Sequence, residues 1–176
     1  MKLNQGLIQV YTGNGKGKTT AALGLALRAI GWNYKVCMVQ FIKGNEKIGE
    51  IQISKKQIPH LSIHQFYNDK KYSIIKPDQK YQKSVIEAWE FFKKILQKNK
   101  YDIIILDEIN IALHYKLLNI NEIIKVLKNK PQNVELILTG RSAPKKIIQI
   151  ADLVTEMKLI KHPFYKNIKA RKGIEY

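Results

Sequence analysis

Short apolar runs alternate along this chain with longer stretches in which apolar residues recur every three to four positions. A run without polar alternation is typical of a parallel strand buried on both faces, and the longer period is typical of an amphipathic helix. The expected strands are 7–11, 35–42, 61–66, 101–107, 134–139 and 153–159. Two expected helices begin at residues 18 and 110, and three others cover 81–98, 121–130 and 144–151. This alternation predicts an α/β fold, with a mostly parallel sheet flanked by helices on both faces.

A glycine-rich stretch follows the first expected strand and leads directly into the first expected helix. Its residues are Gly13, Asn14, Gly15, Lys16, Gly17, Lys18, Thr19 and Thr20. A strand, a glycine loop, Lys-Thr and a helix form the phosphate-binding loop in its required context, so the fold is expected to be of the P-loop, RecA-like type. The glycines let backbone N–H groups turn toward phosphate oxygens, Lys18 adds a mobile positive charge, and the Thr19 hydroxyl can ligate Mg²⁺.

The loop departs from the usual spacing at one position. The usual first glycine would stand at Thr12, but the first glycine here is Gly13, and an extra lysine, Lys16, lies inside the loop. A glycine-rich turn that binds nothing would lack the flanking strand and helix, so phosphate binding remains the better interpretation. The departure weakens the further step to an ordinary hydrolase or kinase.

Two adjacent carboxylates end the apolar run 101–106. Asp107 and Glu108 follow it, and Gln40 ends the expected strand 35–42. The carboxyl ends of parallel strands form the edge where ligands bind in open α/β sheets. In a chain with a phosphate loop, acids at that edge are expected on the metal side of the loop. One carboxylate should orient Mg²⁺ or its water, and the other has a direct or a more distant role.

Composition and charge change this picture little. With 176 residues, the chain is expected to form a single domain over 1–176. A net charge of +17 raises the possibility of a nucleic-acid partner, but 28 of the 31 basic residues are Lys. Selection for phosphate recognition would favour Arg, so we expect no specific nucleic acid. Trp89 and Phe92 are expected to be core contacts rather than a platform for stacking bases.

The chain shows neither a signal peptide nor an apolar run long enough to span a membrane. We therefore expect a cytoplasmic protein without a membrane partner. The lone Cys37 lies in the apolar run 36–39, where a buried and inert thiol is the expected outcome.

Seven segments resemble, in order, those of the phosphate-loop type of ATP:cob(I)alamin adenosyltransferase, the corrinoid adenosyltransferase family of cobalamin biosynthesis and salvage. They are 11–22, 39–44, 106–110, 138–141, 151–157, 161–164 and 169–176. The likeness extends from Gly6 to the C-terminus. The form Gly-Asn-Gly-Lys-Gly-Lys-Thr-Thr, with its late first glycine, is itself typical of that family.

The resemblance implies a specific reaction, in which the 5′-deoxyadenosyl group of ATP moves to the cobalt of a reduced corrinoid and triphosphate is released. ATP and a corrinoid are then the substrates, and the loop residues 13–20 hold the triphosphate. The resemblance also implies that Thr19 and Glu108, together with Asp107, hold Mg²⁺ or Mn²⁺. Lys18 and Glu108 are the expected catalytic residues, and Arg141 is a further expected ligand-binding residue. A flavoprotein that reduces Co(II) and a homodimer are the expected partners.

One departure from that family concerns the corrinoid. Relatives commonly carry a Phe-x-Trp pair ahead of the long helix, placed to shield the lower face of the cobalt. The corresponding region here is 71–74, in which Tyr72 is expected to stand for the aromatic residue and the tryptophan is missing. Residues 66–75 are the candidates for an apolar wall below the corrin ring.

Two other functions remain open. A phosphotransferase, such as a nucleotide or small-molecule kinase, needs cationic groups that contact the phosphoryl group during its transfer. These are often arginines of a mobile lid. This chain has only Arg28, Arg141 and Arg171. A nucleotide-dependent nucleic-acid-binding protein needs aromatic residues interleaved with basic ones on one face, and the sequence shows no such stripe.

Overall fold

The computed structural model describes residues 2–42, 48–56, 58–67 and 79–176. In these residues one six-stranded sheet has the order β3-β2-β4-β5-β1-β6, and all five of its strand pairings are parallel. The strands are β1 (Ile8–Thr12), β2 (Val36–Gln40), β3 (Leu61–Gln65), β4 (Ile103–Asp107), β5 (Glu135–Thr139) and β6 (Leu153–Glu156). The expected α/β class is confirmed.

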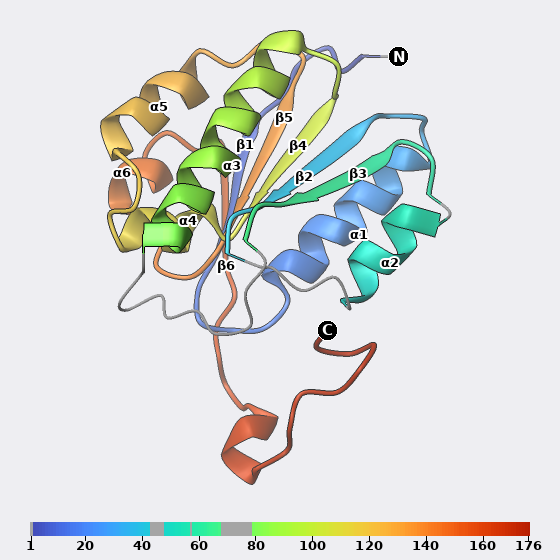
Figure 1. The fold of residues 1–176 in the computed structure, drawn as a ribbon, viewed down its shortest axis with the longest axis vertical. Helices are drawn as coiled ribbons and strands as arrows, with labels where there is room; N and C mark the ends of the chain where they lie inside the picture. Colours follow the sequence, from blue (N-terminus) through green and yellow to red (C-terminus); the bar gives the residue numbers. More distant parts are fainter. Residues whose placement is uncertain (1, 43–47, 57, 68–78) are drawn as a thin grey trace.

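Helices cover both faces of the sheet (Figure 1). They are α1 (Lys18–Ile30), α2 (Gly49–Lys56), α3 (Gln79–Lys98), α4 (Ile109–His114), α5 (Ile120–Lys128), α6 (Lys145–Ile148) and a 3₁₀ helix, η1 (Pro163–Lys166). Helices α3, α4, α5 and α6 lie on one face, and α1 and α2 lie together on the other. The C-terminal segment leaves the body of the domain after β6 and then turns back toward it.

The strands are apolar on both faces because each face has its own core. Cys37 and Val39 pack under α3 and its neighbours, whereas Val36 and Met38 pack under α1. All four side chains are completely buried. Alternate strand residues point to opposite faces, so a sheet covered on both sides requires an unbroken apolar run. This explains the absence of polar alternation in the sequence.

The expectations for individual core residues are confirmed. Burial raises the pKa of the Cys37 thiol to about 11, so the thiol is protonated and inert at neutral pH. Trp89 and Phe92 are buried on α3, with their ring centroids 5.0 Å apart. The indole Nε1 of Trp89 donates a hydrogen bond of 3.0 Å to Glu122. Both aromatic rings are therefore core contacts.

The sequence pattern predicts no helix between the second and third strands, but α2 lies there. This helix has only eight residues, begins at Gly49 and contains two β-branched isoleucines, so its intrinsic helix propensity is low. Ile51 is buried, as is Ile48 just before the helix, and α2 contacts β3. Tertiary packing therefore forms the helix, which local sequence could not indicate. Two other elements are shorter than expected: α6 covers only Lys145–Ile148 and β6 ends at Glu156.

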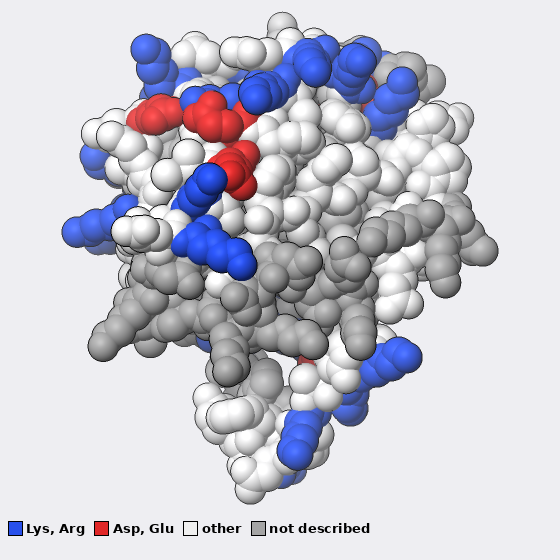
Figure 2. All heavy atoms as spheres, in the orientation of Figure 1, with Lys and Arg blue, Asp and Glu red and all other residues white. Residues whose placement is uncertain are grey.

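Charged side chains are dispersed on the face that carries α3. Figure 2 shows basic side chains along its upper edge and on the C-terminal tail, with acidic ones among them and uncharged surface between. Lys93 on this face pairs with Glu90 at 2.8 Å and with Glu122 at 3.2 Å. Acidic and basic side chains therefore occur together on this face. Among the described residues, no helix has the length and apolar character needed to cross a membrane.

Candidate functional site

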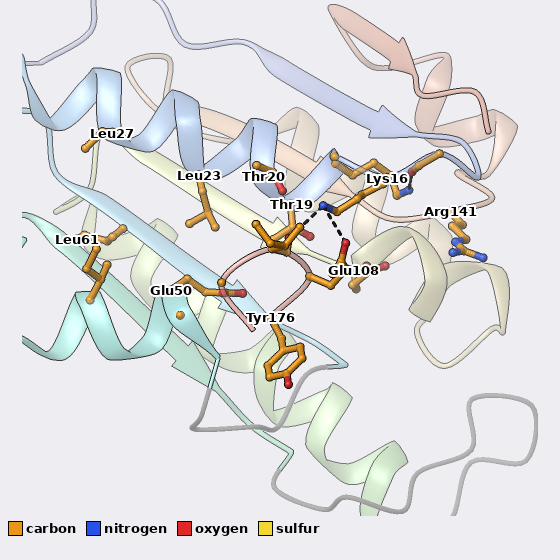
Figure 3. Close-up of a pocket in the computed structure, with 18 of the residues that line it drawn as sticks. Lys16, Thr19, Thr20, Leu23, Leu27, Glu50, Leu61, Glu108, Arg141 and Tyr176 are labelled. Atoms are coloured by element: carbon orange, nitrogen blue, oxygen red, sulfur yellow. Dashed lines mark hydrogen bonds and ion pairs between the residues drawn. The ribbon is translucent and has the colours of Figure 1, made fainter. Parts of the chain in front are cut away.

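A pocket of about 660 Å³ opens at the carboxyl edge of the sheet, beside the N-terminus of α1 (Figure 3). It is lined by residues 14–20 of the glycine loop and first turn, by Leu23, Leu27 and Ile30 of α1, by Gly49, Glu50 and Ile53 of α2, and by Ile58, Leu61, Glu108, Arg141, His162 and residues 173–176. Stretches far apart in the sequence thus meet around one cavity. The carboxyl edge is the place where the sequence predicted a ligand.

The structure brings most of the predicted site residues together. Residues 14–20, Glu108 and Arg141 all line the pocket. Gly13, which follows the last residue of β1, and Asp107, which is completely buried, do not line it. Tyr72 and most of the candidate corrinoid wall lie outside the described residues.

The late first glycine of the loop has a steric cause. Gly13 has φ +92°, and a Cβ at this position would lie 2.5 Å from the carbonyl oxygen of Met157, after β6. Only glycine fits such a left-handed position against a neighbouring backbone. Thr12, at the position of the usual glycine, instead accepts a hydrogen bond from the backbone N–H of Ala143 at 3.2 Å. The threonine ties the β5–α6 connection to the loop.

The two lysines of the loop have different surroundings. Lys18 is only 7% exposed, and its Nζ donates to the carbonyl oxygens of Gly13 at 2.8 Å and Gly15 at 2.6 Å. The ammonium group is therefore held within the loop itself. Lys16 is half exposed, and its Nζ donates to the carbonyl oxygen of Ile174 at 3.0 Å. Lys16 links the loop to the C-terminal segment.

A short turn in the C-terminal segment holds an acid against Lys16. Arg171 donates to the carboxylate of Glu175 through its backbone N–H at 2.7 Å and through Nη2 at 3.0 Å. Glu175 in turn lies 3.6 Å from the Nζ of Lys16. Hydrogen bonds from Arg171 are the main cause that lowers the pKa of Glu175 to about 2. Residues 173–176 thereby form one wall of the pocket.

We expect the contact between Lys16 and Glu175 to survive mild acid. The pKa of Glu175 falls from its usual 4.5 to about 2 in the folded protein, so the ionised contact is fully present above pH 4.5. In the folded protein the carboxylate should stay ionised until the pH approaches about 2, where the contact is lost. A carbon NMR titration of the Glu175 carboxyl checks this, with Arg171→Ala expected to return the midpoint toward 4.5. A parent midpoint near 4.5 would show that the turn does not hold the acid.

Asp107 is a buried acceptor that fixes two hydroxyl groups. Its Oδ1 accepts hydrogen bonds of 2.8 Å from the Oγ1 atoms of Thr19 and Thr139. The Oγ1 of Thr139 also accepts a hydrogen bond of 3.0 Å from the backbone N–H of Glu108. This contact leaves the hydroxyl proton of Thr139 directed at Asp107. Because Thr19 gives its proton to Asp107, its oxygen can act toward the pocket only as an acceptor. Because Asp107 is completely buried, it is not a solvated acid.

Glu108 reaches the pocket through an unusual backbone conformation. It stands between β4 and α4 with φ 64° and ψ 17°, a left-handed geometry that costs a non-glycine residue about 1–2 kcal/mol. Gly140 lies beside it with φ +130°, and a Cβ there would lie 3.2 Å from Oε2 of Glu108 and 3.0 Å from Cβ of Asn110. The glycine after β5 therefore leaves room for the carboxylate of Glu108. Strain of this kind is typical of functional positions.

The two ends of the pocket differ in chemistry. Lys16, Thr19 and Glu108 lie at one end, and the apolar side chains of Leu23, Leu27 and Leu61 lie at the other (Figure 3). Backbone N–H groups, ammonium groups and a helix N-terminus suit phosphates. The oxygens of Thr19 and Glu108 are hard donors of the kind that Mg²⁺ prefers. The pocket can therefore hold an anionic chain at one end and an apolar body at the other.

Sequence reasoning missed two parts of this pocket. Glu50 was missed because its helix, α2, was not expected, and the sequence carries no other signal for it. Glu175 and Tyr176 were not predicted as site residues, although they lie in the segment 169–176 that carries the family resemblance. That segment was the available signal.

Comparison with known proteins identifies the family of the chain. The family model described as ATP:corrinoid adenosyltransferase BtuR/CobO/CobP matches residues 4–176. Over 98% of its length, the chain is 41% identical to a corrinoid adenosyltransferase of Sinorhizobium sp., of which it covers 81%. It is 36% identical to the corrinoid adenosyltransferase CobA of Salmonella typhimurium, again over 98% of its length, and covers 86% of that protein.

Solved structures agree with the fold. The flagellar accessory protein FlaH of Methanocaldococcus jannaschii superposes with a TM-score of 0.62 at 18% identity, covering 88% of this chain and 72% of the other. A KaiC-like protein of Pyrococcus horikoshii superposes with a TM-score of 0.53 at 16% identity, covering 91% of this chain and 76% of the other. These likenesses concern the fold alone. Because the family model and the sequence relatives agree over almost the whole chain, this protein belongs to the ATP:corrinoid adenosyltransferase family.

Proposed function

We propose that the glycine loop holds the triphosphate of ATP as a leaving group while the adenosyl group moves to the corrinoid. The activity itself follows from the family: the chain is a corrinoid adenosyltransferase, with ATP and a corrinoid as its substrates. This excludes the kinase and the nucleic-acid-binding module as readings of the main activity. The observation that carries the proposal is the meeting of Lys18, Thr19 and Glu108 in one pocket.

The reaction needs no nucleophile from the protein. The reduced cobalt supplies the electron pair of the new cobalt–carbon bond, the bond between C5′ and the triphosphate oxygen breaks, and the triphosphate leaves with that bond's electrons. Cys37, the only cysteine, is buried and protonated, so it cannot compete as a nucleophile. The protein's contribution would be to position the reactants, neutralise the leaving group and exclude water.

Each charged group near the loop has a proposed role in holding the triphosphate. Lys18 would exchange its contacts with the Gly13 and Gly15 carbonyls for phosphate oxygens. Lys16 and Arg141 would reach the outer part of the anion, since both line the pocket. Charge-assisted hydrogen bonds contribute about 1.5–3 kcal/mol each, more than neutral ones. The loop would therefore stabilise the negative charge that develops as the triphosphate leaves.

The proposed ligands for Mg²⁺ or Mn²⁺ are Thr19 and Glu108, with Asp107 acting through Thr19. The donor set fits a hard divalent cation, because it consists of a hydroxyl and a carboxylate oxygen at the pocket wall. When bound, such a cation supplies positive charge against the triphosphate oxygens. Asp107, which the sequence analysis counted among the ligands, orients the Thr19 oxygen from beneath.

A product assay tests the proposed function directly. The protein is incubated with ATP, Mg²⁺ and chemically reduced cobalamin, and the corrin absorbance and the phosphate products are followed. Triphosphate and adenosylcobalamin in equal amounts are the expected products. ADP would instead indicate a phosphotransferase, and a failure to consume ATP with any reduced corrinoid would contradict the proposal.

The remaining expectations from the family stay proposals. A homodimer is supported by the edge strand β6, where Leu153 and Val154 are each 42% exposed. A flavoprotein is the proposed reductant of Co(II), and the cytoplasm, which supplies ATP, is the proposed compartment. Tyr72 remains the proposed aromatic residue below the corrin ring.

A further inference from the structure

A row of polar residues crosses the carboxyl edge of the sheet beneath the pocket. Gln40 stands opposite Asp107 in the pairing of β2 with β4, and opposite Gln65 in the pairing of β2 with β3. Paired residues on neighbouring strands direct their side chains to the same face. Gln40 is completely buried and does not line the pocket, so bound ATP would not touch it.

The amide of Gln40 is held at both ends. Its Nε2 donates to Oδ2 of Asp107 at 3.2 Å and, over a longer distance of 3.5 Å, to Oε1 of Glu50. Its Oε1 accepts from Nε2 of Gln65 at 2.7 Å. Carboxylates can only accept, so the end of the amide that faces two of them must carry the hydrogens. The orientation of the amide thus follows from its partners.

We propose that Gln40 is a positioning residue for the adenosyltransferase site. It holds the carboxylate of Asp107 in the orientation in which Oδ1 accepts the hydrogen bond from Thr19. The relay runs from Gln65 through Gln40 to Asp107 and ends at the Thr19 hydroxyl, which is bonded to the opposite carboxylate oxygen at 2.8 Å. This inference rests on the proposed role of Thr19 as a metal ligand.

The relay explains why a polar side chain occupies a buried position. Without the amide, Oδ2 of Asp107 would lose a buried donor, and the carboxylate could turn about its bond to Cβ. Such a turn would move Oδ1, which fixes the Thr19 and Thr139 hydroxyls. Residues that orient a metal ligand from behind typically change metal affinity by about 10- to 100-fold when they are replaced. The same amide also reaches Glu50, which lines the pocket.

The test removes the amide and measures metal binding apart from catalysis. Mn²⁺ serves as the probe, and its affinity for the protein–ATP complex is read from the electron paramagnetic resonance signal of free Mn²⁺. Gln40→Met keeps the length of the side chain and should weaken Mn²⁺ binding by about 10- to 100-fold. Gln65→Met removes only the outer donor and should cause a smaller loss in the same direction. ATP affinity in the presence of a chelator should stay within about twofold of the parent, since Gln40 does not line the pocket.

Gln9 provides a matched control. Its amide is also held at both ends, because Nε2 donates to Glu135 at 2.6 Å and Oε1 accepts from the Tyr11 hydroxyl at 2.6 Å. Gln9→Met therefore removes a similar amide from the same sheet but should leave Mn²⁺ binding unchanged. Equal Mn²⁺ affinity in Gln40→Met and the parent would overturn the relay, as would an equal loss in Gln9→Met. If Gln40→Met does not fold, Gln65→Met decides the question by the same comparison.

Failure of the proposed site can be told apart from failure of the relay. A parent protein that binds ATP but shows no Mn²⁺ site would overturn the metal site and this inference together. A parent that binds Mn²⁺ normally, with no difference among the variants, would overturn the relay alone.

Discussion

Lys18→Ala is expected to lower turnover by about 100-fold or more and to weaken ATP binding to a similar degree. The ammonium of Lys18 is held inside the loop by the carbonyls of Gly13 and Gly15 and is only 7% exposed. A charge-assisted hydrogen bond contributes about 1.5–3 kcal/mol, and about 1.4 kcal/mol corresponds to tenfold in affinity. Alanine removes every such bond that this ammonium makes to the triphosphate. Calorimetric titration with ATP and single-turnover rates measure the two effects.

Lys130→Ala is the control for this variant. Lys130 is also partly buried, and its Nζ donates to a backbone carbonyl, that of Gly6, but it does not line the pocket. Both variants lose a lysine that bonds a carbonyl, so thermal unfolding should report comparable losses of stability. Only Lys18→Ala should lose ATP affinity. Parental affinity and turnover in Lys18→Ala would refute the assignment of the loop to the triphosphate.

Asp107→Asn and Glu108→Gln are expected to fail in different ways, although the two acids are adjacent in sequence. Asp107 is completely buried, and its two oxygens accept from Thr19, Thr139 and Gln40. The NH₂ group of asparagine would face groups that themselves donate, so at least one hydrogen bond would be lost. We expect the free energy of unfolding to fall by about 1–3 kcal/mol. Urea denaturation of the metal-free protein measures this loss. Mn²⁺ affinity should fall as well, because Thr19 loses its anchor.

Glu108 lies at the pocket wall, so its substitution should affect the metal rather than the fold. Glu108→Gln removes the negative charge but keeps the shape, so we expect the free energy of unfolding to change less than in Asp107→Asn. We expect the Mg²⁺ requirement to rise and turnover to fall at limiting Mg²⁺. If both variants match the parent at limiting Mg²⁺, the metal site lies elsewhere.

Asp102→Asn is the matched control for Asp107→Asn. Asp102 lies just ahead of β4, at the opposite edge of the sheet, and is 2% exposed. Its carboxylate accepts a hydrogen bond of 2.8 Å from the backbone N–H of Lys35. Its substitution should destabilise the fold by a similar amount without changing Mn²⁺ affinity. A parallel loss of Mn²⁺ affinity would mean that destabilisation alone explains the effect at Asp107.

Much of the fold and the main chemistry could be predicted because they depend on local pattern. The buried strands carry unbroken apolar runs, and each run lies close to the predicted position; 35–42, for example, contains β2. The glycine loop can also be recognised from local sequence, since positive φ at Gly13 and Gly17 favours glycine at those positions. Neighbouring residues contain all the information that these features need.

The elements that local pattern missed are held by distant contacts. Helix α2 has weak propensity and forms because Ile51 packs in the core. The wall made by residues 173–176 depends on Lys16, whose bond to Ile174 spans 158 positions of sequence. No local period could reveal either of them, because each is stabilised by partners far away in the chain.

The division of labour between the two carboxylates was decided only by tertiary structure. The sequence determined that an acidic pair ends a buried strand and that a Thr lies in the first turn of the helix after the loop. It assigned one carboxylate to the metal and left a direct or a more distant role for the other, but the pattern could not show which environment each would have. Folding brings Thr19 and Asp107 together across 88 positions, which buries Asp107 beneath the hydroxyl. The left-handed backbone of Glu108 turns the second carboxylate into the pocket instead. Adjacent acids acquire different roles because burial and backbone direction, unlike residue type, are set by packing.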